Sequence, residues 1–274
     1  MDFFNSKLIR REYECHGKIG LISIMASSDK IIVGSGDVGN VMVSYTECPG
    51  KHEYVLTEQD GTLTLERKPI TSFLWAIWQP FIDNGIRVTV PGGFNGVLGI
   101  KSSSGRISVS GTDPERVNIE CSSGAVAVEN VNTGRLSITT SSGAVKVTDV
   151  QSGSDISVGC SSGMIALINT TVAKDVSVGN HSGLIRMLNV SAGGSLIAGN
   201  RSGGIHFDSL KTGGNIDLST NSGAIRGTII GRESDYSIIS HTTSGHNGLI
   251  NSRTGEKQLN ASATSGAIRI SFWE

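Results

Sequence analysis

The chain has 274 residues, enough for one elongated domain or for a small domain joined to a larger one, and enough to bury a sizeable core. Its 23 basic and 24 acidic side chains leave a formal net charge of −1, so the overall charge offers no attraction for nucleic acid or an anionic membrane. Glycine is abundant, with 36 residues, whereas proline and aromatic residues are scarce, and this composition suits short strands and tight turns better than long helices.

The first residues, MDFFNSKLIRREYECHG, lack a basic segment followed by an apolar stretch of about 7 to 15 residues, so no secretory signal is recognised. The expected location is therefore the cytoplasm, unless a leader has been removed. The cysteines are too few for a disulfide framework and do not have zinc-ligand spacing, so we expect reduced thiols, no metal and no cofactor. The four cysteines are Cys15, Cys48, Cys121 and Cys160.

Residues 1–97 contain alternating apolar and polar runs, which predict strands, and a likely hairpin sequence, EYVLTEQDGTLTLERK, with Asp60 and Gly61 in its turn. We expect this region to be a β-rich cap that protects the edge of the domain that follows it. The apolar run FLWAIWQPFI, from Phe73 to Ile82, is about half as long as a membrane span, so no transmembrane segment is expected. A buried plug is the first interpretation of this run, and a partner or interfacial contact is the alternative.

From residue 98 to the end of the chain, a Ser-Gly pair returns at steps of 19 to 22 residues. Apolar residues alternate with polar ones on both sides of each glycine, so each repeat holds two short strands. Nine repeats without a helix or hairpin signal predict an all-β fold, a single-stranded parallel β-helix (β-solenoid) of about nine coils of about 20 residues, with a barrel or sandwich as the alternative. The pairs are Ser104-Gly105, Ser123-Gly124, Ser142-Gly143, Ser162-Gly163, Ser182-Gly183, Ser202-Gly203, Ser222-Gly223, Ser244-Gly245 and Ser265-Gly266.

In a β-solenoid each repeat position becomes a column of stacked side chains. Alternation places the serine of every Ser-Gly pair inside the corner, where its hydroxyl would bond a backbone group of the next coil. Small and mostly polar residues point inward three positions before the glycine; two of them, Cys121 and Cys160, are two coils or about 9.6 Å apart, too far for a disulfide. Seven residues after the glycine, a third apolar position is expected in the core. It is occupied by Val131, Val150, Val190, Leu210 and Ile230.

Outward columns are where a binding surface would lie. Three residues after the glycine, a broken basic stripe indicates either a solvated face or a surface for anions or acidic glycans. One and five residues after the glycine, apolar side chains on two neighbouring coils predict an interface, with the amino-terminal region or a second subunit favoured over a ligand. The stripe is Lys146, Arg186, His206, Arg226 and Arg269; the apolar residues are Met164, Ile168, Leu184 and Leu188; a bare strip on the other strand is Gly159, Gly179 and Gly199.

No arrangement of residues predicts catalysis. The stretch GSGDVG, residues 34–39, matches a dinucleotide fingerprint, but a strand rather than a helix follows it. The corner serines lack a GxSxG elbow, and SSDK, residues 27–30, lacks the partner motifs of the serine enzymes that share it. Outward carboxylates are scattered; Asp155 and Asp175 stack, and we expect them to have a structural role in a turn rather than to bind calcium or catalyse.

The stretch GIRVTVPGGFNGVLGIKSSSGRISVSG, residues 85–111, and the earlier GTLTLERK resemble the bacterial adhesin-like family of unknown function DUF4097, in which a VTVP strand leads into Ser-Ser-Gly repeats. The resemblance covers the chain from about residue 54 to its end. It implies a single-stranded β-helix from a bacterium and an association with the cell envelope. The family has no agreed catalytic residues to carry over.

We therefore expect a non-enzymatic binding or scaffold protein whose partner is a protein, a glycan or a second copy of the chain, and not nucleic acid. One alternative is a carbohydrate-active parallel β-helix enzyme, a lyase or hydrolase, which would need clustered carboxylates or a metal in a groove. Another, by family analogy alone, is a component of an envelope-stress sensing system. The expected domains are the cap, residues 1–97, and the solenoid, residues 98–274.

Overall fold

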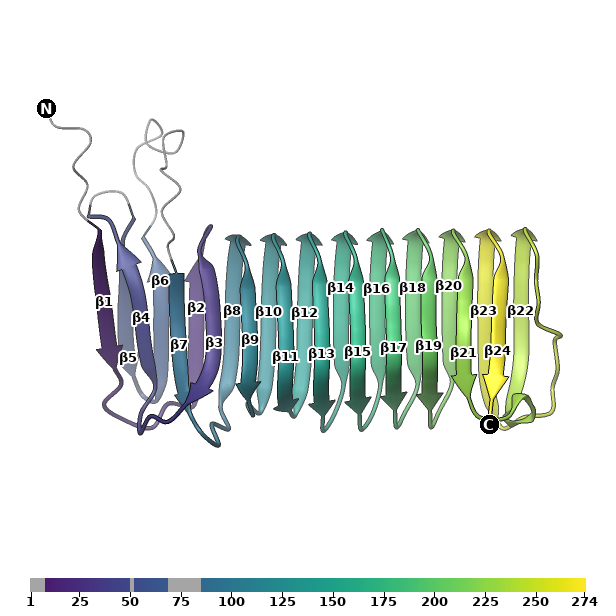
Figure 1. Cartoon of the computed structure of the whole chain (residues 1–274), viewed down its shortest axis with the longest axis horizontal. Coiled ribbons are helices and arrows are strands. Elements are labelled where there is room, and N and C mark those ends of the chain that lie inside the picture. The colour runs from purple at the N-terminus through teal and green to yellow at the C-terminus, as the bar shows by residue number, and fades with distance from the viewer. Residues whose placement is uncertain (1–7, 50–51, 69–84) are drawn as a thin grey trace, which may run out of the picture.

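A computed structural model describes residues 8–49, 52–68 and 85–274. The apolar run from Phe73 to Ile82 lies outside these ranges. The described chain forms an elongated β-solenoid of two facing twelve-stranded sheets (Figure 1). The fold prediction is therefore confirmed. Within the described ranges the only helix is the single turn η1 (Glu233–Asp235), and no helix is long and apolar enough to span a bilayer.

The two sheets, here named A and B, take one strand each from most coils. In sheet A the strand order is β1 (Ile9–Glu14), β4 (Met42–Glu47), β7 (Gly85–Pro91), β3 (Lys30–Gly36), β9 (Ile107–Thr112), β11 (Val126–Thr133), β13 (Val145–Ser152), β15 (Ile165–Val172), β17 (Ile185–Ala192), β19 (Ile205–Thr212), β21 (Ile225–Ile230) and β24 (Ile268–Trp273). In sheet B it is β22 (Tyr236–Ser244), β23 (Lys257–Ser265), β20 (Ile216–Ser222), β18 (Leu196–Ser202), β16 (Val176–Ser182), β14 (Ile156–Ser162), β12 (Arg135–Ser142), β10 (Arg116–Ser123), β8 (Val97–Ser104), β2 (Leu21–Ala26), β6 (Thr62–Arg67) and β5 (Tyr54–Gln59).

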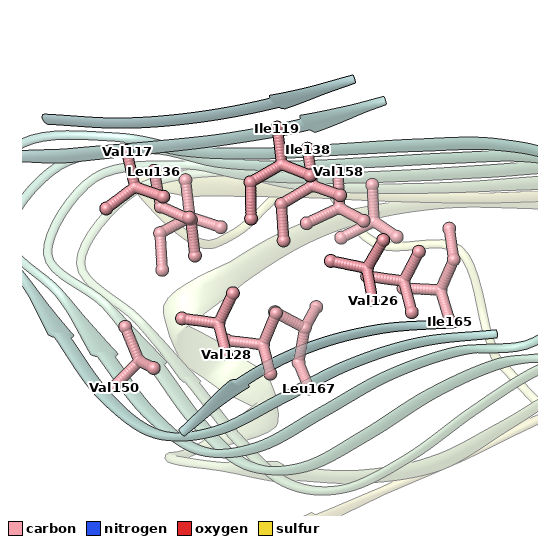
Figure 2. Packing of buried hydrophobic residues seen from close by; sticks show 14 of the residues in the cluster. Val117, Ile119, Val126, Val128, Leu136, Ile138, Val150, Val158, Ile165 and Leu167 are labelled. Atoms are coloured by element: carbon pink, nitrogen blue, oxygen red, sulfur yellow. The ribbon is translucent and has the colours of Figure 1, made fainter. Parts of the chain in front are cut away.

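The core fills the space between the sheets and consists of the alternating residues seen in the sequence. Val117 and Ile119 of β10 point toward Val126 and Val128 of β11, and all four are buried (Figure 2). Neighbouring coils stack in parallel and in register, so that Ile119 of β10 pairs with the equivalent Ile138 of β12. Each apolar position therefore continues as a column through the rod.

The order of coils in space departs from the order in sequence at both ends (Figure 1). The coil formed by β2 and β3 lies between the coil of β6 and β7 and the coil of β8 and β9. At the other end, β23 and β24 insert between β20 and β21 on one side and β22 on the other. Both sheets thus run without interruption across residue 97. The eighth Ser-Gly pair, at Ser244, ends β22 and leads into no sheet A strand. Of the nine predicted coils, eight are therefore two-strand coils with a Ser-Gly corner within residues 97–274.

The corner glycines adopt a backbone conformation that other residues rarely reach. Their φ angles are positive; φ is 137° at Gly124. A Cβ on Gly124 would lie 1.9 Å from the carbonyl oxygen of Gly105 in the preceding coil. Since the glycines stack directly on one another, both the torsion angle and the close backbone approach exclude a side chain at this column.

The prediction that the corner serines point inward is wrong. Cys121 is buried three positions before its glycine, but Ser122 and Ser123 are both exposed, because the chain turns there and the alternation stops. The serine backbone makes the contact instead: the N–H of Gly105 donates to the carbonyl oxygen of Ser123 at 3.1 Å. Backbone groups, rather than serine hydroxyls, join the coils at the corner.

Most of the other predicted inward positions are confirmed. The residues three before the glycine satisfy corner carbonyls; Asn180 donates to the carbonyl of Gly163 at 2.8 Å. Both predicted inward cysteines are free and buried. Seven after the glycine, Val131, Val150, Val190 and Leu210 are buried. The prediction for Ile230 is wrong, because a register shift between β19 and β21 pairs Ile229 with Leu210, and Ile229 is buried in its place.

At the amino-terminal end of the rod, the side chain of Glu58 on β5 connects sheet B to the end of β1 and the turn after it. Its carboxylate accepts hydrogen bonds from the hydroxyl of Tyr13 at 2.7 Å and from the backbone N–H groups of His16 and Gly17. The hydrogen bond from Tyr13, followed by the one from the His16 N–H, lowers the pKa of Glu58 to about 2. This carboxylate joins the turn after β1 to the edge strand of the opposite sheet.

We predict that the corner glycine matters for stability and the corner serine does not. Gly124→Ala should lower the free energy of unfolding by at least about 2 kcal/mol, because the positive φ and the clash with Gly105 act together. Ser123→Ala should change it by no more than about 0.5 kcal/mol. Gly179→Ala, an extended strand position where an added Cβ meets nothing within 4 Å, is the matched control and should not destabilise. Urea unfolding measures all three; equal losses at Gly124 and Ser123 would contradict the backbone account.

We also predict an acid-dependent contribution from Glu58. Because its folded pKa lies below the ordinary value of 4.5, its contribution is complete above about pH 4.5 and is lost as the pH falls toward 2. Glu58→Gln should lower the melting temperature at neutral pH and converge with the unmodified protein near the acid end of this window. Glu66→Gln, at an exposed position of β6, is the control. Parallel curves of melting temperature against pH for the protein and Glu58→Gln would refute the assignment.

Candidate functional site

Basic side chains line one column on the outer face of sheet A. Arg186, His206, Arg226 and Arg269 lie on four adjacent strands, β17, β19, β21 and β24, and they pair in register from each strand to the next. Strand spacing separates neighbours by about 4.8 Å, so the column spans about 14 Å along the rod axis. We call these four residues the basic ladder. Lys146, the fifth residue of the predicted stripe, is separated from it by Ala166.

The basic ladder concentrates positive charge at one place on a chain whose formal net charge is −1. Among the described residues, no carboxylate forms an ion pair with any of its three arginines, which are all exposed. Partial burial, and then the neighbouring Arg226 and Arg186, lower the pKa of His206 below its ordinary value. The imidazole therefore resists protonation, because it is partly buried and because two cations lie beside it.

The predicted apolar cluster lies on the same face and adjoins the ladder. Ile168 and Leu188 lie on the outer side of β15 and β17, since the residues that alternate with them are buried. Met164 and Leu184 directly precede these two strands and follow the same alternation. Ile168 and Leu188 are register partners. Met164 is 44% exposed, and the other three are half-buried. The structure thus brings the four together as an apolar patch; their role as an interface remains a prediction.

The outer face of sheet B carries charges of both signs, such as the paired Lys101 and Glu120, and a strip of glycines. Gly159, Gly179 and Gly199 lie on adjacent strands in extended conformation, and an added Cβ at the first two would meet nothing within 4 Å. Neither backbone strain nor packing requires glycine at these two positions. Toward the amino-terminal end, the same face carries an open trough of about 600 Å³, lined mainly by hydroxyl-bearing residues such as Ser122 and Thr139.

The stacked carboxylates of the turn act on the backbone, as expected. The N–H of Ser195 donates to Oδ1 of Asp175 at 2.7 Å, and the N–H of Asp175 approaches Oδ1 of Asp155 at 3.4 Å. Arg135 pairs with Asp155 as well. Each carboxylate thus accepts a hydrogen bond from the backbone N–H at the equivalent position of the next coil. In the parts of the chain that the structure describes, no three His, Cys, Asp or Glu side chains gather in a way that could hold a metal ion.

A buried polar cluster in the amino-terminal coils was not predicted. Asp29 is completely buried, and Nε2 of His52 lies 3.1 Å from its Oδ1 and 3.0 Å from the hydroxyl of Tyr54. Arg67 approaches the other oxygen at 3.8 Å. Burial alone would raise the pKa of Asp29, but hydrogen bonds from His52 and Tyr54 outweigh it and lower the pKa.

The sequence did contain a signal for this cluster, the stretch SSDK at residues 27–30, which corresponds to a Ser-Ser-Gly corner. Because Ala26 pairs with Ser102 and Ile31 with Ile107, Asp29 occupies the register position of the corner glycine Gly105. Ser27-Ser28-Asp29 is therefore a variant Ser-Ser-Gly corner. Because a buried carboxylate is stable only with polar partners, Asp29 contacts His52, Tyr54 and Arg67 in the amino-terminal coils.

Comparison with known proteins places the chain within a family. No curated protein matches it. Solved structures with similar architecture include a putative adhesin from Bacteroides fragilis, with 12% identity, coverage of 96% of this chain and 97% of that chain, and a TM-score of 0.42. They also include a putative lipid binding protein from Parabacteroides distasonis, with 16% identity, coverage of 98% of both chains and a TM-score of 0.49. The model of the Toastrack DUF4097 family matches residues 19–271, so the chain belongs to that family.

Proposed function

We propose that the chain is a non-enzymatic binding protein that holds an anionic polymer, such as an acidic glycan, on the outer face of sheet A. The observation that carries this proposal is the basic ladder, four stacked basic residues whose arginines have no carboxylate partner among the described residues. The ladder points outward, so the core does not depend on it. An association with the cell envelope, which the family resemblance implies, is part of the proposal.

Repulsion within the basic ladder lowers the stability of sheet A, and no described carboxylate beside the ladder arginines compensates for it. Like charges that face each other on neighbouring strands destabilise a sheet, and Arg226 and Arg269 face each other in this way. A protein that needed only a solvated face could alternate the sign of charge, as Lys101 and Glu120 do on sheet B, where they form an ion pair of 3.0 Å. A bound polyanion would turn the repulsion into attraction.

The shape of the ladder favours a polymer over a small anion. Its basic side chains repeat at about 4.8 Å along the rod axis, perpendicular to the strands. A chain with regularly spaced negative groups can lie along all four positions, whereas one small anion reaches about two of them. The apolar patch at the end of the ladder offers further contact area to the less polar faces of sugar rings. A second copy of this chain is the other partner that could cover the patch.

We predict that binding of a sulfated glycan depends on the ladder. Dextran sulfate should bind the full chain at low salt, and neutral dextran should not. The double variant Arg226→Gln/Arg269→Gln should weaken this binding about tenfold or more, because two charge-assisted contacts are lost. The control Arg116→Gln/Arg201→Gln removes the same charge from exposed positions of sheet B. Equal weakening in both double variants, measured by calorimetry, would show that only net charge matters.

We further predict that binding is coupled to protonation of His206. Partial burial and then the ladder arginines lower the pKa of His206. A bound polyanion should offset the arginine charges and raise this pKa, so the complex takes up a proton. Affinity for dextran sulfate, whose sulfates do not titrate in this range, should increase as the pH falls from about 8 to about 5.5. His206→Gln should remove most of this dependence. Calorimetry in two buffers of different ionisation enthalpy counts the protons; an unchanged proton uptake in His206→Gln would place the coupling elsewhere.

A further inference from the structure

A second basic site lies on the outer face of sheet A, at the amino-terminal end of the rod. A cavity of about 260 Å³ opens there between strands β1, β4, β7 and β3. Three cations line it, each from a different strand: Arg10, Lys30 and Arg87. We infer that this cavity binds a small tetrahedral oxyanion, a phosphate or sulfate group carried by a free ion or by an ester.

The strand register brings the lining residues together on one face. Arg10 pairs with Thr46, Ser44 pairs with Arg87, and Gly85 pairs with Lys30. Arg87, Lys30 and Ser44 point outward, because the residues next to them on β7, β3 and β4 are buried. These buried residues are Ile86 and Val88, Ile31, and Val43. Four adjacent strands therefore contribute three positive charges and two hydroxyl groups to the same cavity.

Among the residues that the structure describes, little negative charge compensates the three cations of the cavity. Arg10 forms an ion pair of 2.9 Å with Glu12 on its own strand, and both side chains are well exposed, so this pair is easily exchanged. Within the described ranges, Lys30 and Arg87 form no ion pair with a carboxylate. A guanidinium can bind two oxygens of a phosphate group at once, while an ammonium acts as a point charge beside it.

Glycine keeps the cavity open. Gly85 does not have a positive φ, and a Cβ added to it would meet no atom of the described residues within 4 Å. Neither the backbone nor the packing of the described residues therefore explains glycine at this position. Since a side chain here would project from the outer face beside Lys30 and close to Arg87, its absence leaves room for a ligand between the two cations.

This site is separate from the basic ladder. Five strand spacings, about 24 Å, lie between β3 and β17, where the ladder begins. A small ligand cannot touch both sites. The inference therefore goes beyond the proposed polymer binding and stands or fails independently of it.

Calorimetric titration of the full chain at low chloride tests the inference, with inorganic phosphate and glycerol phosphate as soluble probes. Vesicles of phosphatidylcholine containing phosphatidic acid test the same phosphate chemistry in a lipid headgroup. Arg87→Gln and Lys30→Gln should each weaken binding about tenfold. Gly85→Val should abolish it without any change of charge, and its melting temperature shows that the fold is intact. Binding of any of the three probes with this pattern supports the site and identifies the source of the phosphate.

The ladder variant Arg226→Gln/Arg269→Gln is the matched control and should bind phosphate as the unmodified protein does. The inference is overturned if no probe binds, if Gly85→Val binds as well as the unmodified protein, or if the ladder variant loses as much affinity as Arg87→Gln. Loss of dextran sulfate binding in the ladder variant, with phosphate binding retained, would show that the two sites act separately.

Discussion

The stacking of glycine on glycine at the corner is the constraint on which the rest of the rod depends. The N–H of Gly124 donates to the carbonyl oxygen of Ser142 in the next coil at 3.1 Å, and its Cα approaches the carbonyl of the coil before at a distance that excludes a side chain. A shift of one residue would put a Cβ into that contact. The corner therefore fixes the register of each Ser-Gly coil against its neighbours.

Because the register is fixed, residues at the same repeat position stack in a column along the rod. A residue type that recurs at one position therefore forms a continuous strip. Apolar columns give a continuous core between two sheets, and the carboxylates of the turn bind one coil to the next. The same rule acts on the outside: cations that recur at one position are forced to stack. Since such repulsion is not relieved by the fold, the basic ladder is the outward feature that most needs a partner to explain it.

The ends of the rod are built differently from its middle. Coils are inserted out of sequence order, antiparallel strands cover the amino-terminal edge, and Asp29 replaces a corner glycine with a buried polar cluster around it. Exposed sheet edges pair readily with another chain, and we expect these departures to protect the ends of the rod from such pairing. They also bring residues from distant parts of the sequence onto one face, which is how Arg10, Lys30 and Arg87 come to line one cavity.

The sequence by itself determined the repeat, the two strands per coil, the buried columns and the basic and apolar outward columns, because alternation and period are local properties of the chain. It did not determine the corner serines, because the alternation on which their placement relied stops where the chain turns, nor Ile230, because one shift of register moved it. Only the tertiary structure decided the order of coils at the two ends, the cluster around Asp29 and the cavity beside Gly85. The residues of these sites come from different strands and follow no period. Only contacts between segments that are far apart in the sequence bring them together.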